Sequence, residues 1–324
     1  YMKMITFFIT LLLSVAMLCS SCSVTGNREK TLLGNPVVKV PTLLDKTNWT
    51  TDTIANGIIY YNFAAKDEVS DASQIVNVLE LDLTNPDYTL ALRYVPECST
   101  LSELAKSAGA IAGMNAGYEQ EAIYLKAENT VFSEVALAPD HLRFWKHEGA
   151  VCWSNNEDIG IWFAGKDGVD AIACYKADTH RNLIASAPML VDNYVPCGVS
   201  FVDAAYTPEQ LNGLDYEDKN RHQGVRHPRT AIALTEDRDL LLITVDGRRS
   251  GQAEGMNAKE LTGFIVKYFS PQYALNMDGG GSTTMYVIGR GDNVTNVVNY
   301  PTDNGIFDHR GERKVSTHFL VMRK

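Results

Sequence analysis

One run of residues, 276–284, has the composition of a ligand-binding turn. It reads Asn-Met-Asp-Gly-Gly-Gly-Ser-Thr-Thr. Glycine loses more backbone freedom on folding than any other residue, so three in a row are expected where the backbone needs a positive φ or approaches a ligand closely. Successive glycine N–H groups can also turn toward one anion. The candidate phosphate-binding residues of this run are Gly279, Gly280, Gly281, Ser282 and Thr283. The run predicts a site for an anionic, hydroxyl-rich ligand such as a sugar phosphate, and a glycine-rich hairpin is the structural alternative.

Two aspartates are the leading acidic candidates for chemistry. Asp246 and Asp278 each follow an apolar segment with strand character, and each is followed by glycine. A helix predicted between the two strands is what a parallel crossover needs. If the strands are parallel neighbours, both carboxylates point into one crevice, where a carboxylate pair could cleave a glycosidic bond. The structural alternative is ordinary Asp-Gly turn chemistry.

The cationic candidates lie near the same strands. Arg229 opens an apolar strand and Arg248 follows Asp246-Gly247, and a guanidinium fork binds phosphate oxygens bidentately. The alternatives are a structural ion pair for Arg229 and a solvated turn for Arg248. His227 could act as an acid or base, or be structural before Pro228.

A turn earlier in the chain adds a candidate sugar contact. Asn115 ends a predicted buried strand beside Ala116 and Gly117, so its amide could hydrogen-bond a sugar hydroxyl, with Gly117 beside it. The alternative is a left-handed turn, which asparagine tolerates.

These residue types fit the cleavage of a bond between an anomeric carbon and a phosphate. The leaving phosphate is already a stable anion, so it needs little protonation. One carboxylate acting as nucleophile or base could then suffice, with cations and backbone N–H groups stabilising the departing phosphate. We therefore predict catalytic roles for Asp246, Asp278 and Arg229.

The composition is that of an acidic globular protein. The 324 residues are 45% hydrophobic and 21% charged, which is not a disordered composition. The formal net charge is -10 and the pI about 5.2, which argues against general nucleic-acid binding because that depends on a basic surface.

The first 21 residues read as a lipoprotein signal peptide. An apolar stretch from Ile5 to Leu18 is too short for a membrane span and ends in small residues before Cys22. We predict lipidation of Cys22, hence a membrane-anchored protein of a bacterial cell envelope. A plain secretory signal is the alternative. Residues 22–48 are predicted to be a flexible tether.

Four further cysteines remain: Cys98, Cys152, Cys174 and Cys197. They could form two disulfides or stay free, and their spacing resembles no zinc ribbon.

Residues 49–324 are predicted to form an α+β domain with a mixed β-sheet core and few helices. Its first part, 49–109, is expected to be an antiparallel meander of strands near 58–63, 74–83 and 88–95, followed by a helix over 99–107. Residues 110–324 carry the motifs and end in a βαβ-like segment. Its helix over 257–269 has Asn257 as N-cap and Glu260 completing a capping box.

The motifs resemble those of the phosphodiester glycosidase family. They are HPRTAI at 227–232, TVDGR at 244–248, Gly-Met at 255–256 and NMDGGGST at 276–283. Further matches are residues 115–118 and 188–191, and the closing Asn299, Pro301, Asp303, Glu312 and Arg313. Ala116 and Glu119 depart from the family pattern. The resemblance runs from about Ala110 to the C-terminus and implies hydrolysis of a sugar-1-phosphodiester in envelope, dietary or host glycans, with release of the sugar.

Two other functions fit the same residues. In a metal-dependent phosphodiesterase, Asp246, Asp278 and Asp303 would supply oxygen ligands. A noncatalytic glycan-binding lipoprotein is the other. We predict no cofactor; a divalent cation is possible but is not indicated by ligand spacing. The expected partners are a glycan or sugar-phosphodiester and, through Cys22, a membrane.

Overall fold

The computed structural model describes residues 48–198 and 206–324 of the chain. The predicted signal peptide, Cys22 and nearly all of the predicted tether lie outside the described residues. Within the described ranges, no helix is both long and apolar enough to span a membrane.

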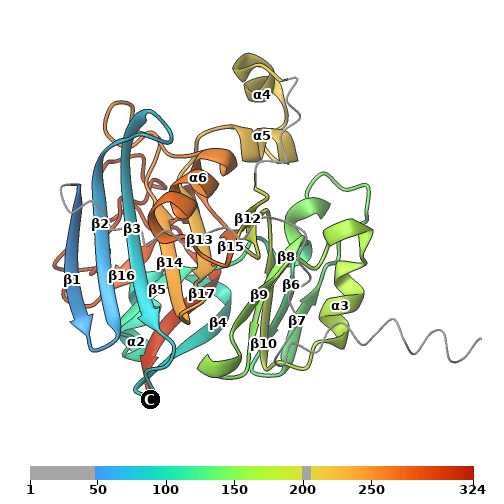
Figure 1. Cartoon of the computed structure of the whole chain (residues 1–324), viewed down its shortest axis with the longest axis horizontal. Coiled ribbons are helices and arrows are strands. Elements are labelled where there is room, and N and C mark those ends of the chain that lie inside the picture. Colours follow the sequence, from blue (N-terminus) through green and yellow to red (C-terminus); the bar gives the residue numbers. More distant parts are fainter. Residues whose placement is uncertain (1–47, 199–205) are drawn as a thin grey trace, which may run out of the picture.

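A large antiparallel sheet forms one layer of the molecule (Figure 1). Its strands, in spatial order, are β1 (Trp49–Ala55), β2 (Ile58–Asp67), β3 (Ala72–Asp82), β14 (Asp239–Val245), β13 (Arg229–Leu234), β15 (Tyr273–Met277), β11 (Met189–Asp192) and β12 (Val195–Pro196). The two predicted parts of the domain are therefore interleaved in one sheet, because β3 of the first part pairs with β14 of the second.

Two smaller antiparallel sheets complete the β structure. One has the order β7 (Thr130–Glu134), β6 (Tyr124–Ala127), β10 (Asn182–Ser186), β8 (Gly149–Trp153) and β9 (Gly160–Trp162), and the other β16 (Met285–Val287), β5 (Ala112–Asn115), β17 (Val315–Arg323) and β4 (Tyr88–Ser99). The expected meander therefore holds for β2 and β3 only, since β4 leaves them to pair with β17.

The helices are few and short. They are α2 (Leu101–Ala108), α3 (Ala171–Ala177), α4 (Pro208–Gly213), α5 (Lys219–Gly224) and α6 (Ala258–Phe269), with 3-10 turns η1 (Gln120–Ala122), η2 (Phe144–His147), η3 (Asn156–Asp158), η4 (Lys166–Gly168) and η5 (Gly280–Ser282). The α+β class is confirmed. The predicted capping box of α6 is also confirmed, because Asn257 Oδ1 accepts from the Glu260 N–H and Glu260 accepts from the Asn257 N–H.

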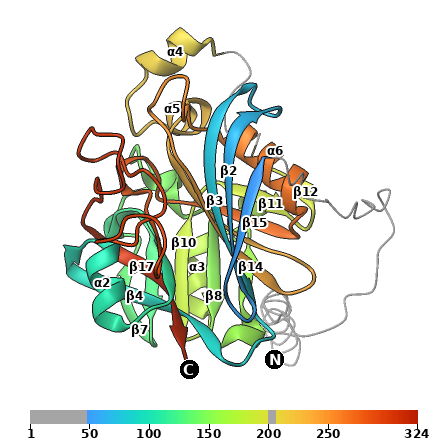
Figure 2. The ribbon, with the colours of Figure 1, turned by 90° about the vertical axis from the view of Figure 1, so that its left-hand side faces the viewer.

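The hydrophobic core has two main layers. One joins the three sheets and contains Leu79, Met114, Ile184, Leu242 and Phe319. The other lies between the opposite face of the large sheet and α6. Figure 2 shows α6 along one side of the large sheet, with α4 at the top of the view and α5 just below it. The sheets therefore meet around a single interior, and the loops at one end are left to form a site.

The βαβ-like segment differs from the simplest expectation in one respect. β14 and β15 run in the same direction, but β13 lies between them and is antiparallel to both. β13 begins where β14 and β15 end. Arg229, the first residue of β13, therefore lies at the same end of the strands as Asp246 and Asp278. The topology thus brings all three predicted catalytic residues to one end of the central strands.

In the described residues, the structure forms no disulfide between Cys98, Cys152, Cys174 and Cys197.

Candidate active site

A cleft of about 370 Å³ opens at the end of the large sheet where β13 begins and β15 ends. Its walls come from the loop after β5, η2, the segment through α5 into β13, the glycine turn after β15, and the ends of β4 and β17. The predicted site residues that line it are Gly117, Arg229, Asp278, Gly279, Gly280, Gly281 and Ser282. Asp246, Asn115, Thr283 and Arg248 are not among the lining residues.

The glycine turn is shaped by close backbone approach. The Gly280 N–H donates to the Pro228 carbonyl at 2.8 Å, and a Cβ on Gly279 would lie 2.7 Å from that same oxygen. Gly280 has φ +61°, which glycine adopts at little cost. The Gly280 amide is therefore committed to the fold. Within the described part of the chain, the N–H groups of Gly279 and Gly281 make no hydrogen bond, which leaves them available to an anion.

Asp278 is the carboxylate of the cleft. Burial raises its pKa to about 7, the Glu119 carboxylate adds to the rise, and a hydrogen bond with Ser282 and the cations Lys146 and Arg313 oppose it. A carboxyl group with a pKa near neutrality can exchange a proton at physiological pH. Asp278 therefore has the position and the acidity of a general acid or base.

Arg229 supplies a buried positive charge to the cleft. Its side chain is 1% exposed, with Nε donating to the Met256 carbonyl at 2.7 Å and Nη2 to the carbonyls of His222 and Val225 at 2.7 and 2.8 Å. Among the described residues, no carboxylate forms an ion pair with it, and Nη1 donates no hydrogen bond. Burial lowers the pKa of Arg229 to about 10. Buried charges are usually paired, so Arg229 is a candidate to bind an anion in the cleft.

Two histidines lie beside Arg229. Burial and the Arg229 charge lower the pKa of His222 far below its usual value and that of His227 to about 3. Both rings are therefore neutral at physiological pH. His227 lines the cleft, and its backbone forms a β-bridge with Met256. Its neutral ring can form a hydrogen bond with a ligand but adds no positive charge to the cleft.

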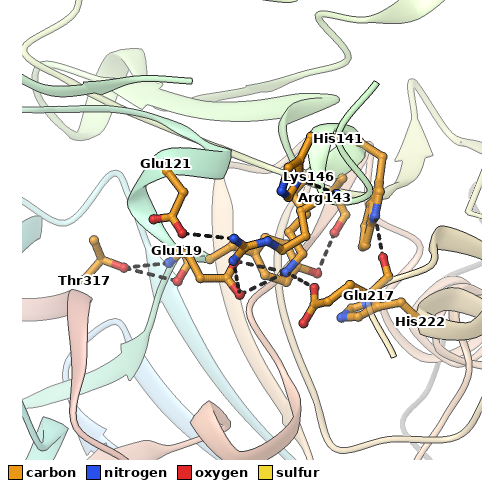
Figure 3. Close-up of polar contacts among 12 residues, drawn as sticks. Glu119, Glu121, His141, Arg143, Lys146, Glu217, His222 and Thr317 are labelled. Carbon is orange, nitrogen blue, oxygen red and sulfur yellow. Dashed lines mark hydrogen bonds and ion pairs between the residues drawn. The ribbon is translucent and has the colours of Figure 1, made fainter. Parts of the chain in front are cut away.

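A cluster of one lysine and two glutamates also lines the cleft, and the sequence analysis did not identify it. Lys146 of η2 is 2% exposed, with its ammonium 2.9 Å from Glu119 Oε2 and 2.6 Å from Glu217 Oε2 (Figure 3). The ammonium also lies 4.7 Å from the centre of the Tyr118 ring. Burial alone would raise the pKa of Glu119, but Lys146 holds it below its usual value. No local signal marks this cluster, because its members are far apart in the sequence.

Two further arginines stand beside the glycine turn. A Cβ on Gly280 would lie 3.2 Å from Arg248 Nη2, and one on Gly281 would clash with the Arg313 guanidinium. Arg313 lines the cleft and donates from Nε to Asp303 at 2.8 Å. Arg248 is exposed and donates to the Thr302 hydroxyl at 3.1 Å, so it flanks the turn from outside the cleft.

Asp246 lies behind the cleft. It is fully buried, and its Oδ1 accepts from the Tyr300 N–H at 2.8 Å and from Asn299 Nδ2 at 3.1 Å. Its other oxygen faces the Asn77 amide without a well-formed hydrogen bond. Side chains alternate along a strand, so Asp246 points with Thr244 toward the other sheets, whereas Arg229 pairs with Val245 on the α6 face. The two predicted carboxylates therefore do not share one crevice.

Asn115 and Thr283 also lie behind the turn. Asn115 is 1% exposed, donates to the Asp278 carbonyl at 2.6 Å and accepts from the Thr284 N–H at 3.0 Å. The Thr283 hydroxyl accepts from Thr230 at 3.3 Å. Both side chains are thus engaged within the fold and do not reach a ligand in the cleft.

The candidate metal ligands are not assembled. Asp303 is paired with Arg313, and Asp246 is buried away from Asp278. Of the residues that the structure places, one group of three has metal-binding distances, namely Cys152, Asp178 and His180, and it lies outside the cleft. Lys126 already contacts Asp178 there, at 3.4 Å. The cleft therefore offers arginines and backbone amides to an anion.

Comparison with known proteins identifies relatives of this fold. A family model described as phosphodiester glycosidase matches residues 108–322. The catalytic domain of zebrafish N-acetylglucosamine-1-phosphodiester alpha-N-acetylglucosaminidase, auto-inhibited by its pro-peptide, has a similar structure. It has 15% identity and a TM-score of 0.53, with 87% of this chain and 86% of that chain covered.

Two bacterial structures are similar as well. A hypothetical protein from Synechocystis has 13% identity and a TM-score of 0.53, with 85% of this chain and 64% of that one covered. A protein from Burkholderia pseudomallei has 14% identity and a TM-score of 0.51, with 85% and 96% covered. No curated protein sequence matches the chain. At these identities the structural matches show the fold alone.

Proposed function

This chain belongs to the phosphodiester glycosidase family, and on that premise we propose that it hydrolyses a sugar-1-phosphodiester, releasing the sugar and leaving a phosphomonoester. The family is one of hydrolases that act on phosphodiester glycosides. The observation that carries the proposal is the buried Arg229 guanidinium, which has no carboxylate partner among the described residues and lines the same cleft as Asp278.

The phosphate would bind between Arg229 and the glycine turn. In residues 48–198 and 206–324, Arg229 Nη1 and the N–H groups of Gly279 and Gly281 are donors at the cleft that make no hydrogen bond, and Arg313 adds a second positive charge. Donors aimed at the departing phosphate would stabilise the transition state, because negative charge develops there as the bond breaks. Because phosphate leaves as a stable anion, the site needs no strong acid at the leaving oxygen.

Asp278 would carry the reaction at the anomeric carbon. In its ionised form it can attack that carbon or take a proton from the attacking water. A pKa of about 7 leaves both its forms populated at neutral pH. After acting as a base, the protonated Asp278 must release its proton to solvent, and a pKa of about 7 permits this at neutral pH. The neutral His227, which lines the same cleft, can accept a hydrogen bond from water or a sugar hydroxyl.

Hydrolysis in ¹⁸O-labelled water tests the proposal. Label in the released sugar is the expected result, because the bond that breaks is the one between the anomeric carbon and oxygen. Label in the phosphomonoester would instead indicate attack at phosphorus, and saturable binding without turnover would indicate a glycan-binding protein.

Variants connect the activity to the cleft. Asp278→Asn should reduce kcat by about 10³-fold or more with the fold intact. The matched control is Asp140→Asn, because Asp140 is exposed and lies outside the cleft. Activity undiminished in Asp278→Asn would remove Asp278 from the mechanism.

We also propose that Cys22 is lipidated and anchors the enzyme in a bacterial cell envelope. The support is the sequence alone, in which an apolar stretch is followed by small residues and Cys22. Incorporation of labelled palmitate should be lost in Cys22→Ser and retained in Cys19→Ser. The reverse pattern would contradict the assignment.

A further inference from the structure

One part of the cleft presents acids to a ligand and keeps its cations behind them. The Lys146 side chain is 2% exposed, whereas the side chains of Glu119 and Glu217, which it pairs with, are 39% and 29% exposed. Glu121 is 46% exposed and pairs with Arg143 at 3.2 Å. A ligand entering here therefore meets carboxylate oxygens first. We call Glu119, Glu121 and Glu217 the acidic wall of the cleft.

The acidic wall has hydrogen-bonding capacity left over. An ionised carboxylate offers about four lone-pair positions, and a buried ammonium or guanidinium occupies only part of them. Sugar hydroxyls and ammonium groups are donors that match such acceptors. The ring of Tyr118 lies under Lys146 and is only 2% exposed, so it supports the ammonium from behind.

We propose that the acidic wall binds the sugar of the substrate and that Glu119 and Glu217 select sugars without a negative charge, meaning neutral or amino sugars and not uronic or other acidic sugars. The proposal rests on the proposed phosphodiester glycosidase function and concerns its substrate class. Its structural basis is the position of Lys146, which is held between two partly exposed glutamates (Figure 3).

The charge arrangement supports exclusion of acidic sugars. The three carboxylates share two cations, Lys146 and Arg143, and both cations are already in ion pairs with the wall. A further carboxylate on the sugar would lack a cationic partner there and would meet like charge at short range. The cations nearer the glycine turn, Arg229 and Arg313, are needed by the phosphate. The cleft thus separates a phosphate end from a hydroxyl-binding end.

The test compares three methyl phosphodiesters that differ only in the sugar: glucose, glucosamine and glucuronic acid, each linked through its 1-phosphate. The expected kcat/KM for the glucuronic acid diester is about tenfold or more below that for glucose. In Glu119→Gln and Glu217→Gln, the kcat/KM values for the glucose and glucuronic acid diesters should lie closer together. Each substitution removes a negative charge and keeps the side-chain shape. Glu134→Gln is the matched control, since Glu134 is an exposed residue of β7 that pairs with Lys176.

Equal cleavage of the glucose and glucuronic acid diesters, or a ratio unchanged by both cleft variants, would overturn the inference. If no diester is hydrolysed, the proposed function fails. Calorimetric binding of the three sugar 1-phosphates then decides the charge inference separately. Weaker binding of the glucuronic acid compound would support it, and equal binding or no binding would overturn it.

Discussion

Replacing Asp246 by asparagine should change how stability depends on pH. The Asp246 carboxyl group is fully buried, and burial raises its pKa to about 7. The ionised form is thus disfavoured in the folded state relative to the unfolded chain, where aspartate titrates near 3.9. A raised folded-state pKa contributes stability that is complete below the unfolded pKa and is lost as the pH rises through the folded one.

The size of the effect follows from the two pKa values. Between pH 5 and pH 8, an aspartate with pKa values of about 7 when folded and about 3.9 when unfolded lowers the free energy of unfolding by about 2.5 kcal/mol. Asparagine does not ionise, so the variant lacks this loss. Its Oδ1 can keep the hydrogen bonds from Tyr300 and Asn299, while its Nδ2 faces the Asn77 amide at a cost that is the same at every pH.

Urea unfolding of wild type and Asp246→Asn at pH 5, 6.5 and 8 measures the difference, with Asp140→Asn as the surface control. The stability of Asp246→Asn relative to wild type should rise by about 2.5 kcal/mol from pH 5 to pH 8. All other titrating groups cancel in this comparison, as does the constant cost at Asn77.

Activity measured on the same proteins completes the prediction. Because Asp246 does not line the cleft, Asp246→Asn should keep kcat within about tenfold of wild type, unlike Asp278→Asn. Parallel pH–stability curves for Asp246→Asn and wild type would refute the argument from burial. A folded Asp246→Asn protein as inactive as Asp278→Asn would place Asp246 in the chemistry.

Three further variants test other parts of the site. Arg229→Lys keeps the positive charge but loses the planar set of guanidinium N–H donors. In kinetic assays KM should rise by about 10-fold or more, and in urea unfolding the free energy of unfolding should fall by about 2–4 kcal/mol. Gly279→Ala, whose Cβ would lie 2.7 Å from the Pro228 carbonyl oxygen, should be destabilised by more than Gly280→Ala, which costs only about 1 kcal/mol for its left-handed φ; equal melting temperatures would contradict this. Lys146→Met leaves two partly exposed glutamates without their shared cation, so the free energy of unfolding should fall by about 1–2 kcal/mol at pH 8. The loss should be smaller in acid, because Lys146 holds the pKa of Glu119 below its usual value; a loss independent of pH would show that this ion pair contributes little.

Features encoded within a few residues could be predicted from the sequence. The start of α6 is one, since Asn257 and Glu260 form its capping box within a single turn. The glycine turn is another, because Gly280 has a positive φ that glycine adopts at little cost. Each depends on neighbours in the chain or on a conformation that few residue types adopt.

Features that depend on strand partners could not be predicted in the same way. The pairing register decides whether Asp246 and Asp278 share a face, because Thr244 and Met277 both pair with Thr230 and this puts Asp246 on the face opposite to Asp278. The sequence of β14 alone does not show this register. β4 has the length and alternation of a meander strand, yet it pairs with β17 at the other end of the chain. Lys146 likewise acquires its role only when distant loops bring Glu119 and Glu217 to it.

The polar residues that do not reach the cleft have a common effect on the glycine turn. Asn115 holds the Asp278 carbonyl and the Thr284 N–H, while Asn299 donates to the Thr283 carbonyl and accepts from the Met285 N–H at 2.8 Å. Asp246 accepts a hydrogen bond from Asn299 in turn. The turn is thus fixed from behind by buried side chains, so its cleft side need not rearrange to bind a phosphate. Donors that are held in place before charge develops stabilise a transition state more than donors that must reorganise. In the proposed mechanism, residues that the sequence suggested as ligand contacts would therefore act indirectly, by holding the backbone that contacts the phosphate.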